Sequence, residues 1–213
     1  MLGHIVCGGP NPWVPEGIEE EGYLIGVDAG ALFLAQFDIK MDHVVGDFDS
    51  VSELDYFYIL SNTKTHEKLV AEKDDTDLEA AIKHAIDAGC DEIIVYGATG
   101  GRIDHQIAAQ ALILKFIKQK IWITLMDELN IISILPPDEY NLTVVNHYQS
   151  FFAVSETVKN LTITGVKYEL KDYDLAVDDP LCISNEALSD SFYVKFTTGY
   201  LMWIQSNDER NIA

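Results

Sequence analysis

The chain changes its secondary-structure pattern once, and this change limits the folds open to it. Before the pair Pro136-Pro137, short apolar runs alternate with helical segments. The apolar runs cover residues 2–7, 23–27, 92–96 and 121–126, and glycine-containing turns follow the first three. Strands that alternate with helices build a mostly parallel sheet covered by helices. The first part of the chain is therefore expected to be an α/β domain.

The clearest helix follows residue 76. Apolar side chains recur there at the three- and four-residue spacing that places them on one helix face. They are Leu78, Ala81, Ile82, Ala85 and Ile86. Thr76 and Glu79 have the spacing of a capping box, and Gly89 provides a stop signal. A second helix is predicted from residue 103 to 118, directly after the glycine-rich loop 97–101.

Helical patterns vanish after the two prolines. Short β-rich segments replace them, and turn residues separate these segments at short intervals, which is typical of a small antiparallel sandwich or barrel. The predicted strands are 151–154, 161–164, 182–183, 192–196 and 201–205. We therefore predict two domains, one at residues 1–137 and one at residues 138–213.

The net charge argues against one class of binding partner. The 213 residues include 35 acidic and 14 basic ones, so the formal net charge is −21. Such a field repels the phosphates of nucleic acids, and a nucleic-acid partner is not expected. The charge either keeps the protein soluble or also attracts a cationic substrate, and the sequence leaves both readings open.

The sequence also bears on the compartment. The N-terminus has no basic segment followed by an apolar one, so no signal peptide is expected. No run of about 18 apolar residues is present, so no membrane contact is expected either. The three cysteines form no CxxC pair, which fits free thiols in a reducing compartment. We expect a cytoplasmic protein.

Three short acidic clusters carry most of the functional information. They cover residues 46–50, 73–77 and 100–105. Each follows an apolar run or precedes a helical pattern, where an α/β fold places its ligand-binding edge. Carboxylates gathered at one edge repel one another unless a cation lies among them, and Mg²⁺ is the oxygen-seeking cation of phosphate sites. The clusters predict metal-dependent phosphoryl or pyrophosphoryl transfer.

In the first cluster, Asp47 and Asp49 are two residues apart. An extended backbone points such side chains to the same side, which suits two metal ligands. Gly-Asp and Asp-Ser pairs are also common in turns. Taken alone, the cluster fits a metal site and a turn equally.

The second cluster places Asp74, Asp75 and Asp77 before the clearest helix. Acidic residues at a helix N-terminus are stabilised by the helix dipole. That effect accounts for one or two carboxylates, whereas this segment has three in four positions. Lys73 supplies part of the compensating charge, and a metal ion would supply the rest.

The third cluster joins a glycine-rich loop to a helix start. The loop 97–101 places backbone N–H groups at the positive end of the following helix, an arrangement that binds phosphate. Arg102 adds a guanidinium that can hold phosphate oxygens with two hydrogen bonds. Asp104 and His105 fall in the first helical turn. The loop matches neither the Walker A nor the GxGxxG pattern.

With order and spacing combined, the chain resembles the thiamine pyrophosphokinase (thiamine diphosphokinase) family along nearly its whole length. In the first part, residues 28–31 are similar to the family's DxGA, 46–50 to its GDxDS, 73–77 to its KDxTD and 97–105 to its GxxGGRxDH. In the second part, 161–170 resembles its GLKYxL strand, with Val166 in place of the usual leucine, and 184–186 matches its SNE.

The resemblance implies a reaction and an architecture. The reaction would transfer the terminal pyrophosphoryl group of ATP to the hydroxyl of thiamine, giving thiamine diphosphate and AMP, with Mg²⁺ as the cofactor. The architecture would be a Rossmann-like catalytic domain followed by a β-sandwich, in a homodimer that holds thiamine at the subunit interface.

The resemblance also implies roles for single residues. Asp47, Asp49 and Asp77 would hold Mg²⁺, and either Asp75 or Asp104 would orient or deprotonate the hydroxyl. The implied ATP contacts are Lys73, Asp74, Thr99, Gly100, Gly101, Arg102 and His105.

The implied thiamine contacts come from both parts of the chain: Asp28, Ser184, Asn185, Thr198 and Trp203. Trp203 would stack on a thiamine ring as a cation–π contact. The alternation of Leu201 and Trp203 with their neighbours also fits a place in the sandwich core.

Two other functions are compatible with the sequence. One is a related pyrophosphokinase that acts on another alcohol, such as a pterin. The other is a non-catalytic module that binds thiamine or a nucleotide. The number of clustered carboxylates argues against a module that only binds.

Overall fold

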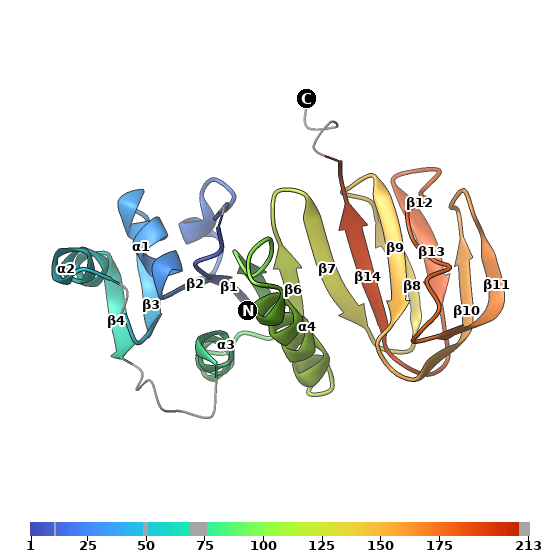
Figure 1. Cartoon of the computed structure of the whole chain (residues 1–213), viewed down its shortest axis with the longest axis horizontal. Helices are drawn as coiled ribbons and strands as arrows, with labels where there is room; N and C mark the ends of the chain where they lie inside the picture. Colours follow the sequence, from blue (N-terminus) through green and yellow to red (C-terminus); the bar gives the residue numbers. More distant parts are fainter. Residues whose placement is uncertain (11, 49–50, 69–75, 209–213) are drawn as a thin grey trace. The chain divides into compact units, whose positions relative to one another are not determined.

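The computed structural model describes residues 1–10, 12–48, 51–68 and 76–208. The chain divides into two compact units, Met1–Asp127 and Glu128–Ala213. All the α-helices of the described residues belong to the first unit, and the second unit is built from strands (Figure 1). The predicted change from α/β to all-β structure is therefore found.

The division lies earlier than the predicted boundary at residue 137. Strand β7 (Asn130–Leu135) pairs along its whole length with β14 (Leu201–Ser206), near the end of the chain. This pairing places β7 in the second unit. The proline pair, which we took as the boundary, lies in the short link from β7 to the next strand.

The first unit contains a parallel sheet in the order β6-β5-β1-β2-β3-β4. Its strands are β1 (Leu2–Val6), β2 (Tyr23–Val27), β3 (Met41–Gly46), β4 (Thr63–Lys68), β5 (Glu92–Tyr96) and β6 (Trp122–Met126). Strands β2, β3 and β4 lie on one side of β1, and β5 and β6 lie on the other. The connections that leave β1 and β5 therefore lead in opposite directions along the sheet. Such a switch point is where doubly wound sheets bind ligands.

Helices cover both faces of this sheet. They are the 3₁₀ helix η1 (Ile18–Glu20) and the α-helices α1 (Ala29–Gln36), α2 (Glu53–Ser61), α3 (Asp77–Asp87) and α4 (Ile103–Ile117). Helix α1 packs with Leu24 and Val44, whereas α3 lies over Tyr23 and His43. Neighbouring residues of a strand point to opposite faces. Helices α1 and α3 therefore cover opposite faces of the sheet.

Helix α2 and strand β4 were not predicted from the sequence. Only Ile59 is buried in α2, and Leu54 and Phe57 are exposed, so the helix has no apolar stripe. Strand β4 is an edge strand whose six residues are all polar. Neither element carries the apolar periodicity on which sequence prediction depends.

The predicted N-cap of α3 is present. The Thr76 hydroxyl accepts a hydrogen bond from the Glu79 backbone N–H (3.2 Å). The Glu79 carboxylate forms ion pairs with Lys83 (3.2 Å) and Lys115. Lys115 belongs to α4, so Glu79 ties the two helices together.

The second unit consists of antiparallel strands in the orders β12-β9-β14-β7 and β11-β10-β13-β8. The strands not yet defined are β8 (Glu139–Thr143), β9 (Tyr148–Ala153), β10 (Thr157–Thr164), β11 (Leu170–Ala176), β12 (Asn185–Glu186) and β13 (Ser191–Lys195). The predicted strand at Cys182-Ile183 is wrong, because Cys182 lies in a turn and Ile183 in the irregular segment before β12.

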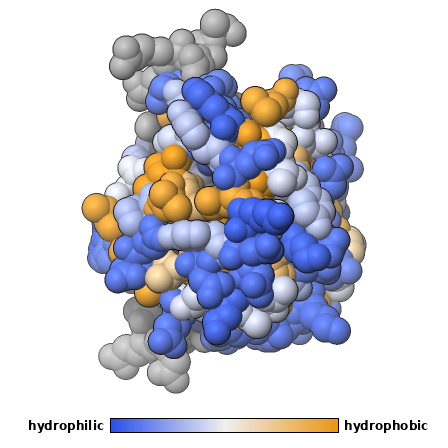
Figure 2. Space-filling model, turned by 90° about the vertical axis from the view of Figure 1, so that its right-hand side faces the viewer, coloured by the Kyte–Doolittle hydropathy of each residue, from blue (hydrophilic) through white to orange (hydrophobic). Residues whose placement is uncertain are grey.

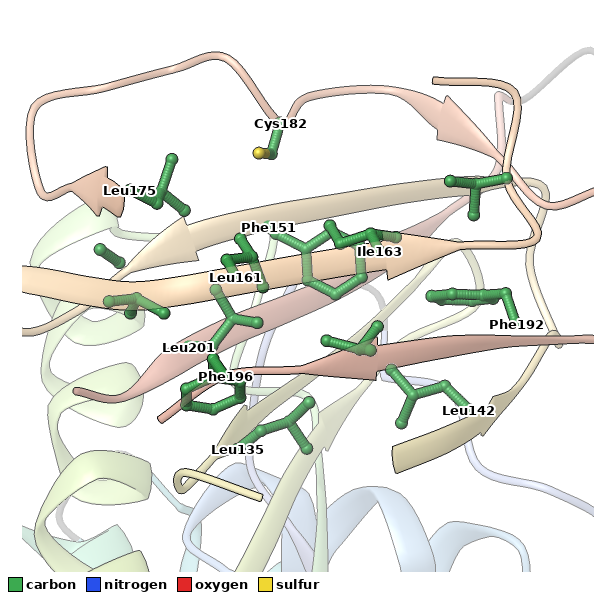
Figure 3. Packing of buried hydrophobic residues seen from close by; sticks show 14 residues of the cluster. Leu135, Leu142, Phe151, Leu161, Ile163, Leu175, Cys182, Phe192, Phe196 and Leu201 are labelled. Atoms are coloured by element: carbon green, nitrogen blue, oxygen red, sulfur yellow. The ribbon is translucent and has the colours of Figure 1, made fainter. Parts of the chain in front are cut away.

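A hydrophobic core fills the space between these two groups of strands (Figure 3). Phe151 of β9 is fully buried, and its ring meets the ring of Phe192 of β13 edge to face, with 6.1 Å between centroids. Leu161 and Ile163 of β10 point into the same core. The fold class predicted for the second part, a small antiparallel sandwich, is confirmed.

One face of the molecule is largely hydrophilic, and Figure 2 shows apolar groups among the larger hydrophilic area of this face. The large apolar side chains that the second unit exposes are Val145, Tyr168, Val177, Leu181, Ile183 and Leu188. Among the described residues, no helix has the length and apolar character needed to cross a membrane.

Candidate active site

A pocket of about 740 Å³ lies in the first unit, at the carboxyl ends of its strands. The loops after β1, β2, β3 and β5 and the first turns of α3 and α4 form its wall. Most of the described site residues predicted for the first unit line it: Asp28, Asp47, Asp77, Thr99, Gly101, Arg102, Asp104 and His105. Parallel strands thus bring together carboxylates that are far apart in the chain.

The loops around the pocket approach one another closely, and two glycines permit this. Gly97 follows β5 at φ 67°, and a Cβ there would lie 2.2 Å from the carbonyl oxygen of Cys7. Gly46 ends β3, and a Cβ there would lie 1.9 Å from Oδ1 of Asp28. No side chain fits at either distance. The missing side chain at Gly46 thus leaves room for the Asp28 carboxylate at the end of β3.

Asp28 itself has an unusual backbone. It stands at the N-cap of α1 with φ 47° and ψ −119°, and its N–H donates to the Val45 carbonyl (3.0 Å). A residue with a Cβ pays an energetic cost of order 1–3 kcal/mol in such a conformation, and these residues gather at functional sites. The strain places the Asp28 carboxylate in the pocket.

The environment of the Asp28 carboxylate disfavours its charge. Burial, followed by the neighbouring carboxylates of Asp77 and Asp47, raises the pKa of Asp28 to about 7, and the Phe48 N–H acts in the opposite direction. Among the described residues, Oδ1 of Asp28 is buried without a hydrogen-bond partner. An unsatisfied buried oxygen beside two other carboxylates is a position that a cation would stabilise.

These three side chains supply the ligand type of a hard divalent cation, although one oxygen from each does not come within 4.8 Å of the other two in this structure. Asp28, Asp47 and Asp77 offer only carboxylate oxygens, which are the ligands that Mg²⁺ prefers over nitrogen or sulfur. The fit rests on the buried oxygen of Asp28 and on the repulsion that raises its pKa. Asp28, which the family motif assigned to thiamine, thus lies beside the predicted metal ligands.

The glycine loop leads into α4 as predicted. Gly100 has φ 77°, and Arg102 is the N-cap of α4 but its side chain makes no capping bond. The Thr99 hydroxyl donates to the Asp127 carboxylate, which anchors the loop. The start of α4 therefore keeps backbone N–H groups for an anion.

Arg102 and Asp104 form an ion pair at the mouth of this loop, with 2.5 Å between Nη2 and Oδ2. The Arg102 guanidinium lowers the pKa of Asp104 to about 2. The His105 backbone N–H donates to the same carboxylate (3.0 Å). Asp104 is therefore ionised throughout the physiological range and is a weak base while the pair persists.

The structure adds wall residues that the sequence analysis did not select. Cys7, Gly8, Gly9 and Pro10 follow β1 and line the pocket beside the glycine loop. The pair Gly8-Gly9 directly after the first strand was the available signal. An apolar part of the wall comes from α3 and α4, namely Leu78, Ala108, Ala109 and Leu112.

Four predicted residues lie outside the described part of the chain: Asp49, Lys73, Asp74 and Asp75. The other predicted residues are found in the second unit, except for Gly100, which belongs to the glycine loop. Ser184 is exposed at φ 56°, and its N–H donates to the Ser150 hydroxyl (3.0 Å).

Asn185 is buried and fully engaged with backbone groups. Its Nδ2 donates to the Tyr168 carbonyl (2.8 Å), and its Oδ1 accepts from the N–H groups of Tyr168 (3.1 Å) and Glu186 (3.0 Å). Asn185 thus links the two motifs of the second unit that resemble the family, GLKYxL and SNE.

Thr198 and Trp203 occupy different environments. Thr198 is exposed, and its carbonyl accepts from the Lys159 N–H (3.2 Å). Trp203 is half-buried against the core, its ring meets Phe192 edge to face, and its indole N–H donates to Gln149 (2.9 Å). Much of the Trp203 side chain is packed against the core, as the second interpretation of the sequence pattern expects.

Comparisons with known proteins agree with this division of the chain. The model of one family, described as thiamin pyrophosphokinase, catalytic domain, matches residues 14–125. A second, described as thiamin pyrophosphokinase, vitamin B1 binding domain, matches residues 132–201. The chain belongs to the thiamine pyrophosphokinase family. The family predicted from the motifs is thus confirmed.

Individual members of the thiamine pyrophosphokinase family match along nearly the whole chain. Thiamine pyrophosphokinase from Bacillus subtilis is 37% identical over 210 residues, which cover 96% of this chain and 98% of the relative. A crystal structure of the Bacillus subtilis protein has a TM-score of 0.87 at 34% identity, covering 98% of this chain and 100% of that chain. A thiamin pyrophosphokinase family protein from Enterococcus faecalis has a TM-score of 0.88 at 32% identity, with the same coverage.

The contact between Gly46 and Asp28 yields a prediction. The Cβ of Gly46→Ala would meet Oδ1 of Asp28 at 1.9 Å and displace the carboxylate. A displacement of about 1 Å in an active site can cost about 100-fold in rate, so we expect a loss of turnover of that order. Steady-state rates measured at saturating metal would show it.

The matched control is Gly17→Asn. Gly17 has φ 78° and nothing within 4 Å of its Cβ position, and asparagine tolerates this backbone region. Its turnover should equal that of the unchanged protein. Full activity in Gly46→Ala would contradict the role given to the Asp28 carboxylate.

Proposed function

We propose that the protein transfers the pyrophosphoryl group of ATP to the hydroxyl of thiamine, giving thiamine diphosphate and AMP. One observation carries the proposal: a single pocket joins the carboxylates of Asp28, Asp47 and Asp77 to a glycine-rich loop at a helix N-terminus. Membership of the thiamine pyrophosphokinase family supplies the acceptor alcohol.

The carboxylates are proposed to hold Mg²⁺. Asp47 and Asp77 are the ligands expected from the motifs, and Asp28 joins them through its buried Oδ1. Asp49 is the further ligand expected from the same motif. Bound Mg²⁺ would neutralise the charge that develops on the phosphates during transfer.

The glycine loop is proposed to hold the phosphates. Backbone N–H groups at the start of α4 would donate to phosphate oxygens, and Thr99, Gly100 and Gly101 shape this turn. Arg102 would exchange its partner Asp104 for a phosphate oxygen, because a guanidinium binds both groups in the same geometry. His105 lines the same wall. Lys73 and Asp74 remain predicted ATP contacts.

The low pKa of Asp104 suits a hydrogen-bond acceptor better than a proton acceptor. While paired with Arg102, Asp104 accepts hydrogen bonds well but takes up a proton poorly. It is therefore proposed to orient the thiamine hydroxyl as a hydrogen-bond acceptor. Asp75 is the alternative proton acceptor.

Thiamine is proposed to contact the second unit. Ser184 and Thr198 are exposed and present hydroxyl groups, and Trp203 offers the part of its ring that the core leaves uncovered. Asn185 is proposed to act indirectly, because backbone groups already satisfy its amide. It would fix the segment that carries Ser184.

The first test is the chemistry of the products. With ATP, Mg²⁺ and thiamine, the protein should form thiamine diphosphate and AMP in equal amounts, as measured by chromatography. Asp77→Asn should lower this rate by at least about 100-fold, because it removes a charged metal ligand from the pocket. Formation of ADP in place of AMP would contradict pyrophosphoryl transfer.

Asp87→Asn is the matched control for Asp77→Asn. Asp87 is exposed at the opposite end of the same helix, so the change removes an equal charge far from the pocket. Its rate should remain that of the unchanged protein. Competition between thiamine and a pterin alcohol would identify the acceptor, and preference for the pterin would overturn the thiamine assignment.

A homodimer is also proposed, and the exposed apolar residues of the second unit support it. Contact between copies would remove such groups from water. Light scattering after gel filtration should give twice the chain mass of 23.8 kDa. A particle of 23.8 kDa at working concentrations would contradict the dimer.

A further inference from the structure

Three potential metal ligands meet on the sheet face that α3 covers. His43 comes from β3, Glu67 from β4 and His84 from α3. One ligand atom from each lies within 4.8 Å of the other two. In the sheet register, His43 pairs with Thr65 and Val45 pairs with Glu67, so alternation puts His43 and Glu67 on one face. None of the three lines the active-site pocket.

The hydrogen bonds around His43 favour one tautomer. The Thr65 hydroxyl lies 2.9 Å from the Asp42 carbonyl oxygen and 2.8 Å from Nδ1 of His43, and when it donates to the carbonyl it accepts from Nδ1–H. In that tautomer, Nε2 of His43 carries a bare lone pair. His43 is 4% exposed, and this nitrogen is buried without a partner among the described residues. A buried acceptor left unsatisfied is costly and calls for a ligand.

The other two residues complete a donor set. Nε2 of His84 is hydrogen-bonded to the Tyr23 hydroxyl (3.1 Å), just as Nδ1 of His43 is bonded to Thr65. A second-shell partner on one ring nitrogen is usual for histidines that bind a metal through the other. Glu67 is exposed, and no ion pair to it is found among the residues that the structure describes.

We propose that His43, His84 and Glu67 bind a divalent transition metal ion such as Zn²⁺, in a site separate from the carboxylate pocket. Two imidazoles and one carboxylate suit Zn²⁺, with water in the fourth position, whereas Mg²⁺ prefers oxygen ligands alone. Burial, followed by the neighbouring His84, lowers the pKa of His43 to about 4, so its imidazole is neutral at physiological pH.

Metal binding requires a local rearrangement. The His43 and His84 rings are stacked, with 3.6 Å between centroids and 7° between planes, so their lone pairs lie in nearly parallel planes and do not meet at one point. His84 lies half-buried on α3 and must tilt out of the stack for the lone pairs to converge. The bound metal would then tie α3, which begins with Asp77, to β3 and β4.

The test is calorimetry of Zn²⁺ binding to metal-free full-length protein in excess Mg²⁺, which occupies the oxygen-rich pocket. We expect one Zn²⁺ per chain that Mg²⁺ does not displace. Glu67→Gln and His84→Gln should each weaken Zn²⁺ binding by about tenfold or more. Co²⁺ in place of Zn²⁺ should give a visible absorption spectrum typical of four-coordinate geometry, and both variants should diminish it.

His66→Gln is the matched control, because His66 is exposed on β4 and points to the opposite face. It should bind Zn²⁺ as tightly as the unchanged protein. Absence of Zn²⁺ binding, displacement by Mg²⁺, or equal affinity in the Glu67 and His84 variants would overturn the site. These readouts do not involve turnover, so they are independent of the proposed reaction.

Discussion

The first unit is organised around the repulsion of three carboxylates. Asp28, Asp47 and Asp77 come from the ends of β2 and β3 and from the start of α3, and they share one pocket. The pKa of Asp28 is raised because burial and its two neighbours oppose its charge. A cation removes this conflict, and its charge then becomes available to phosphate groups. The same repulsion of charges is what the proposed binding of a metal and a nucleotide would relieve.

The geometry of that arrangement depends on close backbone contacts. Gly46 leaves room for the Asp28 carboxylate, and Gly97 lets the loop after β5 touch the loop after β1. The start of α4, which the Arg102 side chain does not cap, lines the same pocket. The proposed metal ligands and the proposed phosphate donors therefore lie at one switch point of one sheet.

Much of the site could be predicted from the sequence, because each motif is local. Residues 46–50 and 97–105 are continuous segments whose spacing already specifies a carboxylate pair and an anion loop. The partnership of Asp28 with Asp77 could not be predicted, because it depends on strand order. The approach of Gly8-Gly9 to the glycine loop was missed for the same reason. Helix α2 and strand β4 could not be predicted because they lack apolar periodicity. The contact of His43 with His84 could not be predicted either, because it depends on which face of the sheet α3 covers.

We infer that the carboxylates of Asp28, Asp47 and Asp77 bind a divalent cation. The most direct measurement is an anomalous difference map from crystals in which Mn²⁺ replaces Mg²⁺. We predict a peak within coordinating distance of at least two of the carboxylates of Asp28, Asp47 and Asp77. A map with Mn²⁺ bound only elsewhere would contradict the account.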